Sequence, residues 1–218
     1  MKSLMRKELM LSAAPITFVF ILFSTMAMIP GYPILVGAFF ICFGIFQSFQ
    51  SACANNDILY TVLLPVKKTD VVKAKYGFTL LIQMLSFTIT VILTFFRMTV
   101  LADAAPYTQN AMMNANSFFL AGNLLVFALF NGLFLGGFFK PADRYGKPFL
   151  LFSIAAFLLI TAAETLHHIP GLEFLNDTAA AGNGAMWLLF AIALIIYIGT
   201  SILSCRASMK RFEAVDIG

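Results

Sequence analysis

The Lys and Arg residues of this 218-residue chain are confined to short clusters that alternate with long apolar runs. The gaps at 30–32, 103–114 and 167–184 carry no Lys or Arg, and Arg97 is the one basic residue outside the clusters. Because short basic loops are retained on the cytoplasmic side of a membrane, this alternation predicts a polytopic membrane protein with both termini in the cytoplasm. The four clusters are Lys2, Arg6 and Lys7; Lys67, Lys68, Lys73 and Lys75; Lys140, Arg144 and Lys147; and Arg206, Lys210 and Arg211.

The composition supports a membrane protein. Hydrophobic residues make up 61% of the chain, charged residues 11%, and the mean hydropathy is +0.91. A soluble fold has too little interior to bury this much apolar surface. The formal net charge of +4 belongs to loops that face anionic lipid headgroups, so we interpret it as contact with the bilayer and expect no nucleic-acid partner.

The apolar runs predict an all-α integral membrane protein with six transmembrane helices in a single domain, 1–218. Each run approaches the ~20 residues that cross ~30 Å of hydrocarbon. Short alternating segments typical of a transmembrane barrel are absent. The runs lie at about 14–29, 33–54, 77–101, 115–139, 149–166 and 185–204.

The first apolar run also resembles the core of a signal peptide, because it follows Lys2, Arg6 and Lys7. The run is too long for that role and no small-residue cleavage site follows it. Leu4 and Leu9 lie opposite Arg6 on a helical wheel. We therefore predict a short helix at the inner interface, with a disordered basic start as the alternative.

The segment 55–76 is too apolar for a free linker and too polar to span a membrane. Ile58, Leu59 and Val62 have helical spacing behind a possible Asn or Asp cap, and Pro65 would end that helix. Thr69 or Asp70 would cap the next helix. A short amphipathic helix exposed to the cytoplasm and a plain interfacial linker both fit this pattern.

Within this segment, the sequence NDILYTVLLPVKKTDVVKAKY resembles the cytoplasmic loop of ABC-2 type permeases. The small size and the start MKSLMRKEL are similar to the compact permeases of bacterial peptide exporters, such as those of phenol-soluble modulins. The resemblance implies a type V ABC exporter-like permease fold, a second permease chain (identical or paralogous), and a cytoplasmic ABC ATPase that docks on this loop. The coupling residues implied are Asp57, Ile58, Leu59, Tyr60, Leu64, Pro65, Lys67, Lys68 and Asp70.

The chain has no G-x-x-x-x-G-K-[ST] phosphate loop, so an ATP-driven pump would need its ATPase on another chain. This chain is then not an enzyme and binds no cofactor; ATP and Mg belong to the partner. No carboxylate or histidine lies at the centre of a run, which disfavours ion coupling. The prediction is an exporter subunit in the bacterial cytoplasmic membrane that moves amphipathic peptides or lipophilic compounds. The alternative is the substrate-binding component of an energy-coupling-factor importer.

Two polar stripes are candidates for a translocation path. Polar side chains in apolar helices avoid lipid, so a stripe faces either a path or the interior of the bundle, and both interpretations remain open. The stripe of the third run repeats at helical spacing, and a shorter one ends the second run. The members are Gln83, Ser86, Thr90, Thr94 and Arg97 in the third run, and Gln47, Gln50 and Ser51 in the second.

Other motifs predict contacts rather than chemistry. Gly132 and Gly136, with Ala128, form a small-residue ridge that predicts close helix packing, within one chain or between two. Arg97 and Glu164 both lie near outer helix ends, where they would pair or reach the interface separately. Adjacent histidines point about 100° apart on a helix, so His167-His168 predicts interfacial residues. We expect neither a metal site nor a catalytic residue.

Overall fold

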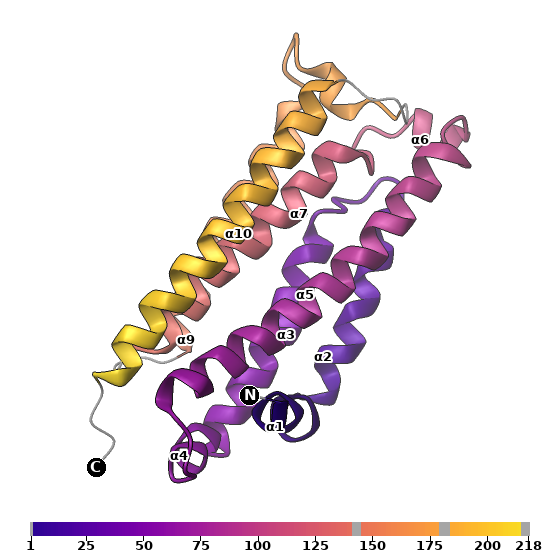
Figure 1. The fold of residues 1–218 in the computed structure, drawn as a ribbon. Helices are drawn as coiled ribbons and strands as arrows, with labels where there is room; N and C mark the ends of the chain where they lie inside the picture. Colours follow the sequence, from indigo (N-terminus) through magenta and orange to yellow (C-terminus); the bar gives the residue numbers. More distant parts are fainter. Residues whose placement is uncertain (1, 141–144, 179–183, 215–218) are drawn as a thin grey trace.

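A computed structural model describes residues 2–140, 145–178 and 184–214. Long helices lie side by side in an elongated bundle, and the described residues contain no strand (Figure 1). The N-terminal helix α1 (Lys2–Lys7), the short helix α4 (Asp57–Val62) and the C-terminal end of α10 (Gly184–Glu213) lie at one end of the bundle, here termed the basic end. The longer loops lie at the other end, here termed the loop end. Arg144 of the third basic cluster falls outside the described residues.

Five helices are long and apolar enough to cross a membrane. A sixth span arises if the bent pair Ser3–Met10 and Pro15–Met28 is counted as one crossing. The spans of the described residues agree in order with the apolar runs of the sequence, and they agree in number if the bent pair is one crossing. The main elements are α2 (Pro15–Phe20) with η2 (Ile21–Met28), α3 (Val36–Ala54), α5 (Lys68–Thr99), α7 (Ser117–Leu129) with η3 (Phe130–Leu135) and α8 (Gly136–Phe138), α9 (Gly146–Leu166) and α10 (Gly184–Glu213).

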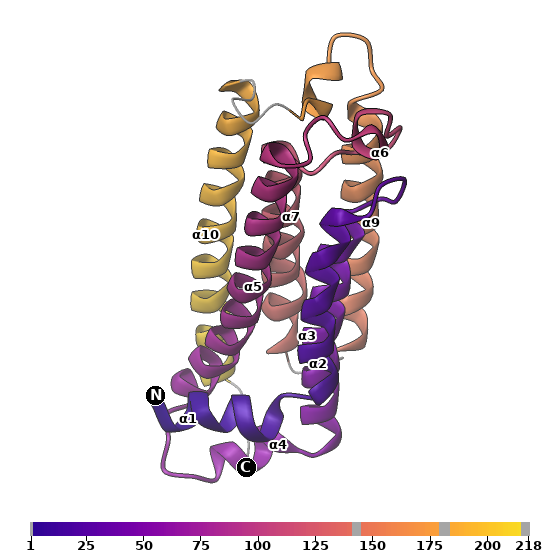
Figure 2. The same cartoon turned by 90° about the vertical axis from the view of Figure 1, so that its right-hand side faces the viewer.

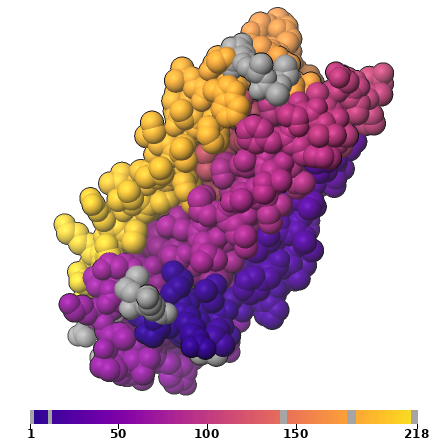
Figure 3. Space-filling model, turned by 45° about the vertical axis from the view of Figure 1, so that its right-hand side comes forward, coloured from indigo at the N-terminus to yellow at the C-terminus, as the bar shows by residue number. Residues whose placement is uncertain are grey.

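The N-terminal segment crosses the basic end instead of entering the bundle directly. α1 (Lys2–Lys7) and the π-helical turn η1 (Glu8–Ser12) run across the base of the bundle (Figure 2), and the chain bends by 84° before α2. Leu4 is buried and Arg6 is exposed, as the helical wheel predicts. In the space-filling view this segment lies against α4 and the start of α5 (Figure 3).

The first span combines an α-helix with a 3-10 helix. A 3-10 helix rises about 2.0 Å per residue, so α2 and η2 together cover about 25 Å with only 14 residues. The chain then reverses through Gly31, whose φ of 70° is readily adopted by glycine. The Gly31 amide donates to Asn110 Oδ1 at 3.0 Å, which fixes this turn to the loop between α5 and α7.

α5 begins nine residues before the predicted run at 77–101. It spans Lys68–Thr99, so it absorbs the end of the segment 55–76. The predicted caps at Thr69 or Asp70 are wrong, because the N-cap residue is Lys67 and no side chain caps it. Asp70 instead lies in the first turn, where its negative charge interacts favourably with the helix dipole.

Besides α1, η1 and α4, the described residues form two further short helices. These are α6 (Ala105–Thr108) and η4 (Glu173–Asn176), and both belong to the connections at the loop end. The predicted cap of α4 through an Asn or Asp side chain is also wrong. The backbone of Asn56 has the left-handed helical conformation, with a φ of 52°, and the Asn56 side chain makes no cap hydrogen bond. Pro65 follows the end of α4 as predicted, three residues beyond Val62.

The small-residue ridge packs inside the chain. A Cβ on Gly132 would lie 3.0 Å from Thr200 Cγ2, and one on Gly136 would lie 2.9 Å from Ser204 Oγ. Both neighbours belong to α10, so the ridge lets α10 approach the π-helical η3 and α8 closely. Gly137 faces α9 in the same way, since a Cβ there would lie 2.8 Å from Pro148.

Aromatic side chains fill the interior between α3, η3 and α9. Phe46 stacks on Phe149 with ring centroids 3.8 Å apart, and Phe39 stacks on Phe152 at 5.7 Å. Phe134 of η3 meets Phe46 edge to face at 5.6 Å. Because lipid is as apolar as these rings, their contribution comes from packing and ring geometry rather than from removal of water.

We predict that Gly136→Val destabilises the bundle by about 1–3 kcal/mol, because the added atoms collide with α10. Gly199→Val is the matched control, since nothing lies within 4 Å of a Cβ at Gly199. Thermal unfolding in detergent checks the difference. Equal melting temperatures for the two variants would contradict the packing of the ridge on α10.

Candidate functional site

Four charged side chains form a closed ring at the basic end, here termed the charge ring. Lys7 Nζ lies 3.1 Å from Glu8 Oε1 and 2.6 Å from Asp57 Oδ1. Lys75 Nζ lies 2.6 Å from Glu8 Oε2 and 3.0 Å from Asp57 Oδ2. Each carboxylate therefore bridges both ammonium groups. The ring joins α1 and η1, α4 and α5 at one point.

The charge ring is buried on the α5 side. Only 2% of the Lys75 side chain and 1% of the Glu8 side chain are exposed. Lys7 Nζ also donates to Thr61 Oγ1 at 2.8 Å, which adds a second tie to α4. Removing one partner of a buried ion pair leaves an uncompensated charge and typically costs about 3–5 kcal/mol. The ring therefore holds α4 in a defined position against α5.

Asp57 is ionised in this environment. Burial opposes the carboxylate, but the charge of Lys75, with the hydrogen bonds and charge of Lys7, outweighs it and lowers the pKa of Asp57 below its usual value. A depressed carboxyl pKa contributes stability above the unfolded-state pKa, and this contribution is lost as the pH falls through the folded-state pKa. The contribution of Asp57 to the ring is thus present at neutral pH and is lost in acid.

The other predicted coupling residues divide into buried and exposed groups. Ile58 is buried, while Lys68 and Asp70 are half-buried, with Asp70 Oδ1 3.5 Å from Lys73 Nζ. Pro65 and Lys67 are exposed. Four exposed apolar side chains dominate the remaining surface of this segment, and together they are here termed the docking face. They are Leu59 (45% exposed), Tyr60 (66%), Leu63 (74%) and Leu64 (54%). Leu63 was not among the predicted coupling residues, although its position in the same apolar run could have indicated it.

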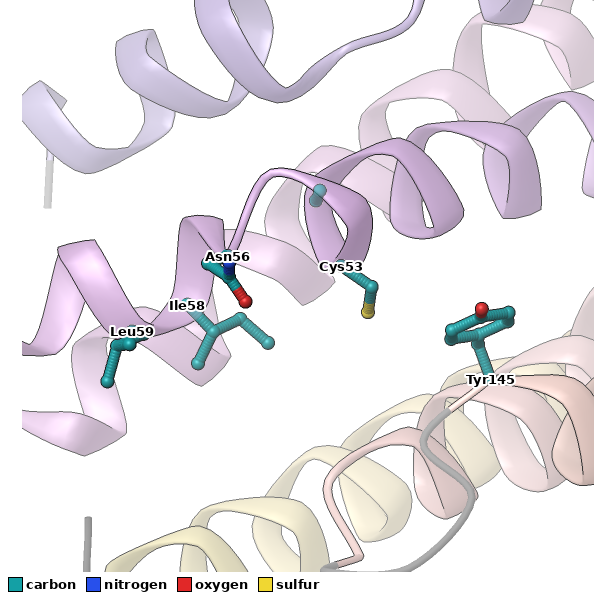
Figure 4. A pocket seen from close by; sticks show the side chains of 6 residues that line it. Cys53, Asn56, Ile58, Leu59 and Tyr145 are labelled. Carbon is teal, nitrogen blue, oxygen red and sulfur yellow. The ribbon is translucent and has the colours of Figure 1, made fainter. Parts of the chain in front are cut away.

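A pocket of about 230 Å³ opens beside the docking face (Figure 4). Cys53 from the end of α3, Ile58 from α4 and Tyr145 before α9 line it. Ala52, Asn56 and Leu59 complete the lining. The pocket thus lies where three segments converge at the basic end, next to the largest exposed apolar residues of α4.

The polar stripe of α5 lies inside the bundle. Gln83, Ser86, Thr90, Thr94 and Arg97 are each no more than 2% exposed. Thr90 Oγ1 donates to the Ser86 carbonyl at 3.0 Å, and the same carbonyl accepts from Ser24 Oγ at 3.2 Å. The stripe therefore packs against other helices of the same chain. A translocation path along it remains a prediction.

Gln83 is the centre of a hydrogen-bond network between α5, η3 and α10. Its amide pairs reciprocally with that of Asn131, with distances of 3.0 and 3.1 Å. Tyr197 Oη donates to Gln83 Oε1 at 3.0 Å, and Asn131 Nδ2 also donates to Ser201 Oγ at 3.0 Å. Sequence reasoning missed Asn131, Tyr197 and Ser201. The signal was an Asn in the apolar run 115–139, but this run also holds Asn116 and Asn123, and the partners of Asn131 come from distant helices.

This network continues to the basic end through the π-helical segment. Side chains of α10 bind one backbone carbonyl of η3 and one of α8. Ser204 Oγ donates to the Asn131 carbonyl at 2.6 Å, and Arg211 Nη1 donates to the Gly136 carbonyl at 2.7 Å. Tyr76 Oη lies 2.7 Å from Ser204 Oγ. Hydrogen bonds therefore join α5 to α10 through Tyr76 and Gln83, and Asn131 of η3 is bonded to both of these helices.

The stripe of α3 lies in a different environment. Gln50 is exposed, and Gln47 and Ser51 are half-buried, all toward the basic end of α3. Nearby Ser48, which was not predicted, is buried and binds the start of α2: its Oγ accepts from the Ala14 amide at 2.8 Å and lies 2.7 Å from Thr17 Oγ1. Of the two predicted stripes, only the one on α3 reaches the molecular surface.

Arg97 organises the loop end. Its guanidinium donates to the Ala27 carbonyl at 2.6 Å and to Asn114 Oδ1 at 2.8 Å, and it stacks on the Tyr107 ring at 4.2 Å. The predicted pairing of Arg97 with Glu164 is wrong, because Glu164 Oε1 accepts from the Met113 amide at 2.8 Å instead. Arg97 thus connects η2, α5 and the following loop.

The described residues contain no group of three or more His, Cys, Asp or Glu side chains that could hold a metal ion. His167 is 6% exposed, and its Nε2 lies 3.4 Å from the Ala111 carbonyl, so it packs under the loop. His168 is exposed at the loop end.

We predict that Asn131→Leu destabilises the bundle by about 1–2 kcal/mol, because it removes both hydrogen bonds between Asn131 and the buried Gln83 amide and leaves only the bond from Tyr197. Asn123→Leu is the matched control: Asn123 is also buried in α7, but its side chain binds only the Phe119 carbonyl of its own helix. Unfolding in detergent measures both. The double variant Gln83→Leu with Asn131→Leu should cost less than the sum of the single changes, and strict additivity would exclude the pair.

A family model described as an ABC-2 family transporter protein matches residues 3–213, almost the whole chain. No curated protein and no solved structure matches significantly. The match covers the charge ring, α4 and all the predicted spans, in agreement with the resemblance of the segment 55–76.

Proposed function

Because the chain belongs to the ABC-2 family of transporter permeases, we propose that it is the membrane-spanning subunit of an ATP-driven exporter in the bacterial cytoplasmic membrane. ATP and Mg are bound by a separate cytoplasmic ATPase, since this sequence has no phosphate loop. A multi-pass helical bundle with no metal cluster among the described residues fits a transport subunit. Membership of this family favours the permease over the importer component considered above.

The observation that carries the proposal is the docking face held in place by the charge ring. Leu59 and Tyr60 of α4, with Leu63 and Leu64 directly after it, expose apolar side chains at the basic end. Exposed apolar patches of this kind mark interaction sites. The pocket beside Leu59 offers a concave site for one side chain of the ATPase.

The charge ring would convert movement of α4 into movement of the spans. Asp57 joins α4 to Lys75 of α5 and to Lys7 of the N-terminal segment. α5 has 32 residues and so extends about 48 Å as one rod. This helix carries Lys75, Gln83 and Arg97. A displacement of α5 at the charge ring would therefore also move the hydrogen-bond network around Gln83, here termed the central network, and the contacts of Arg97 at the loop end. Asp57 is then a positioning residue and not a contact for the ATPase.

The basic end would face the cytoplasm. α1, α4, the C-terminal end of α10 and three of the four basic clusters lie there, and basic segments are retained inside during insertion. An ATPase in the cytoplasm requires the docking face on this side. The loop end, with Arg97 beneath its connections, would then face outward.

The cargo would be amphipathic or lipophilic, such as small peptides. A second permease chain would complete the translocation path. The sequence places no Asp, Glu, Lys or His at the centre of a span, so a path offers hydroxyls and amides without a fixed charge. The stripe of α5 is sealed within one chain in this structure. A path between two copies would therefore use other surfaces, or open by separation of α5 from η2 and η3.

We predict that Tyr60→Ala with Leu63→Ala abolishes capture of the ATPase, because it removes the two most exposed side chains of the docking face. The measurement is co-purification from membranes with the ATPase encoded beside the permease gene, followed by stimulation of ATP hydrolysis. Met10→Ala, which removes an apolar side chain 65% exposed on the N-terminal segment, is the control and should leave capture unchanged. Normal capture by the double variant would overturn the docking assignment.

The orientation predicts which introduced cysteines react with an impermeant thiol reagent in intact cells. Cys42, Cys53 and Cys205 are first replaced so that only the new site reports. Gln109→Cys, at an exposed position of the loop end, should be labelled, whereas Lys210→Cys, exposed at the basic end, should react only after the membrane is permeabilised. The reverse pattern would place the basic end outside.

A further inference from the structure

A wholly apolar slot opens between α9 and α10 in the loop-end half of the bundle, with α7 as its floor. Its volume is about 170 Å³. α9 and α10 each pack on α7 but make at most marginal contact with each other (Figure 2). The lining residues are Phe118, Ala121, Gly122, Leu125, Leu159, Ala162, Ala163, Leu166, Leu189, Ile192, Ala193 and Ile196.

The slot has a floor of small side chains and a rim of branched ones. Ala121, Ala163 and Ala193 are no more than 5% exposed and form its depth. Leu189 and Ile192, respectively 39% and 45% exposed, belong to the rim on α10. Because these rim residues are exposed on the outside of a membrane-spanning bundle, the slot opens sideways toward lipid, not toward water.

Water does not suit this slot. A buried water needs two to four polar partners, and none of the lining side chains has a polar atom. A cavity of about 150 Å³ lined by similar residues stays dry and accepts a molecule of benzene. An empty slot would forfeit the dispersion contacts of its lining. Hydrocarbon is the chemistry that fits.

The dimensions favour a single chain over a helix. A helix with its side chains is about 10 Å wide, and its axis stays about 8–10 Å from a neighbour. A space of about 170 Å³ cannot hold it, but a methylene chain can enter. Leu166, the last lining residue of α9, is also the last residue of that helix. The slot therefore lies at the depth of the acyl chains of the loop-end leaflet.

We propose that this slot binds one acyl chain of a membrane lipid from the loop-end leaflet. The chain fills the gap between α9 and α10 and replaces the direct contact that these helices lack. This site is independent of the proposed transport function, because it requires only that the bundle spans a bilayer.

The test uses the full-length protein in vesicles of phosphatidylglycerol that carry a diazirine on the acyl chain, followed by irradiation and peptide mapping. Labelling should concentrate on 118–125 and 159–166. Ala162→Phe, which fills the slot, should lower labelling of these peptides by about tenfold. Ala191→Phe is the matched control, since Ala191 is exposed on α10 but does not line the slot; its labelling should match the wild type.

Leu159→Ala gives a second measurement if Ala162→Phe fails to fold, because it enlarges the slot and should preserve or increase labelling. Uniform labelling around the bundle, unchanged by Ala162→Phe, would overturn the proposal. So would a disulfide between two copies carrying Leu159→Cys in a background without native cysteines, because it would show that a second chain covers the slot.

Discussion

The structure depends on one constraint: polar groups within the hydrocarbon must be bonded inside the chain. For the backbone this requires helices. For side chains it requires partners from neighbouring helices, and the pair of Gln83 with Asn131 meets it most completely. Backbone carbonyls of η3 and α8 also bind side chains of α10, since Ser204 donates to the Asn131 carbonyl and Arg211 donates to the Gly136 carbonyl. The position of α10 is therefore set by hydrogen bonds as well as by the glycine ridge.

α5 connects the polar sites of the bundle. Lys75 belongs to the charge ring, Gln83 to the central network and Arg97 to the loop-end contacts, so three different kinds of interaction act on one helix. The ring balances two ammonium groups against two carboxylates, which makes burial of Lys75 and Glu8 tolerable. A short, partly exposed helix is thereby held by ion pairs to the longest span.

The candidate site was partly accessible from sequence. The apolar content of 58–64 indicated a surface helix, and the exposure of Leu59, Tyr60 and Leu64 agrees with it. The role of Asp57 was not accessible, because its partners Lys7 and Lys75 lie 50 and 18 residues away along the chain. The same holds for Arg97. Its position near a helix end suggested Glu164 as a partner, yet the carbonyl of Ala27 and the amide of Asn114 bind it instead.

The sequence by itself determined the helical class, the order of the spans and the identity of the basic end, because these follow from hydropathy and from where charge is tolerated. It also placed polar residues of α5 on one face, since helical period alone decides that. Only the tertiary structure decided that this face is buried, that the glycine ridge meets α10 of the same chain, and that α9 and α10 leave a slot between them. Those outcomes depend on how helices far apart in sequence pack, and the period of a single helix contains no information on its neighbours.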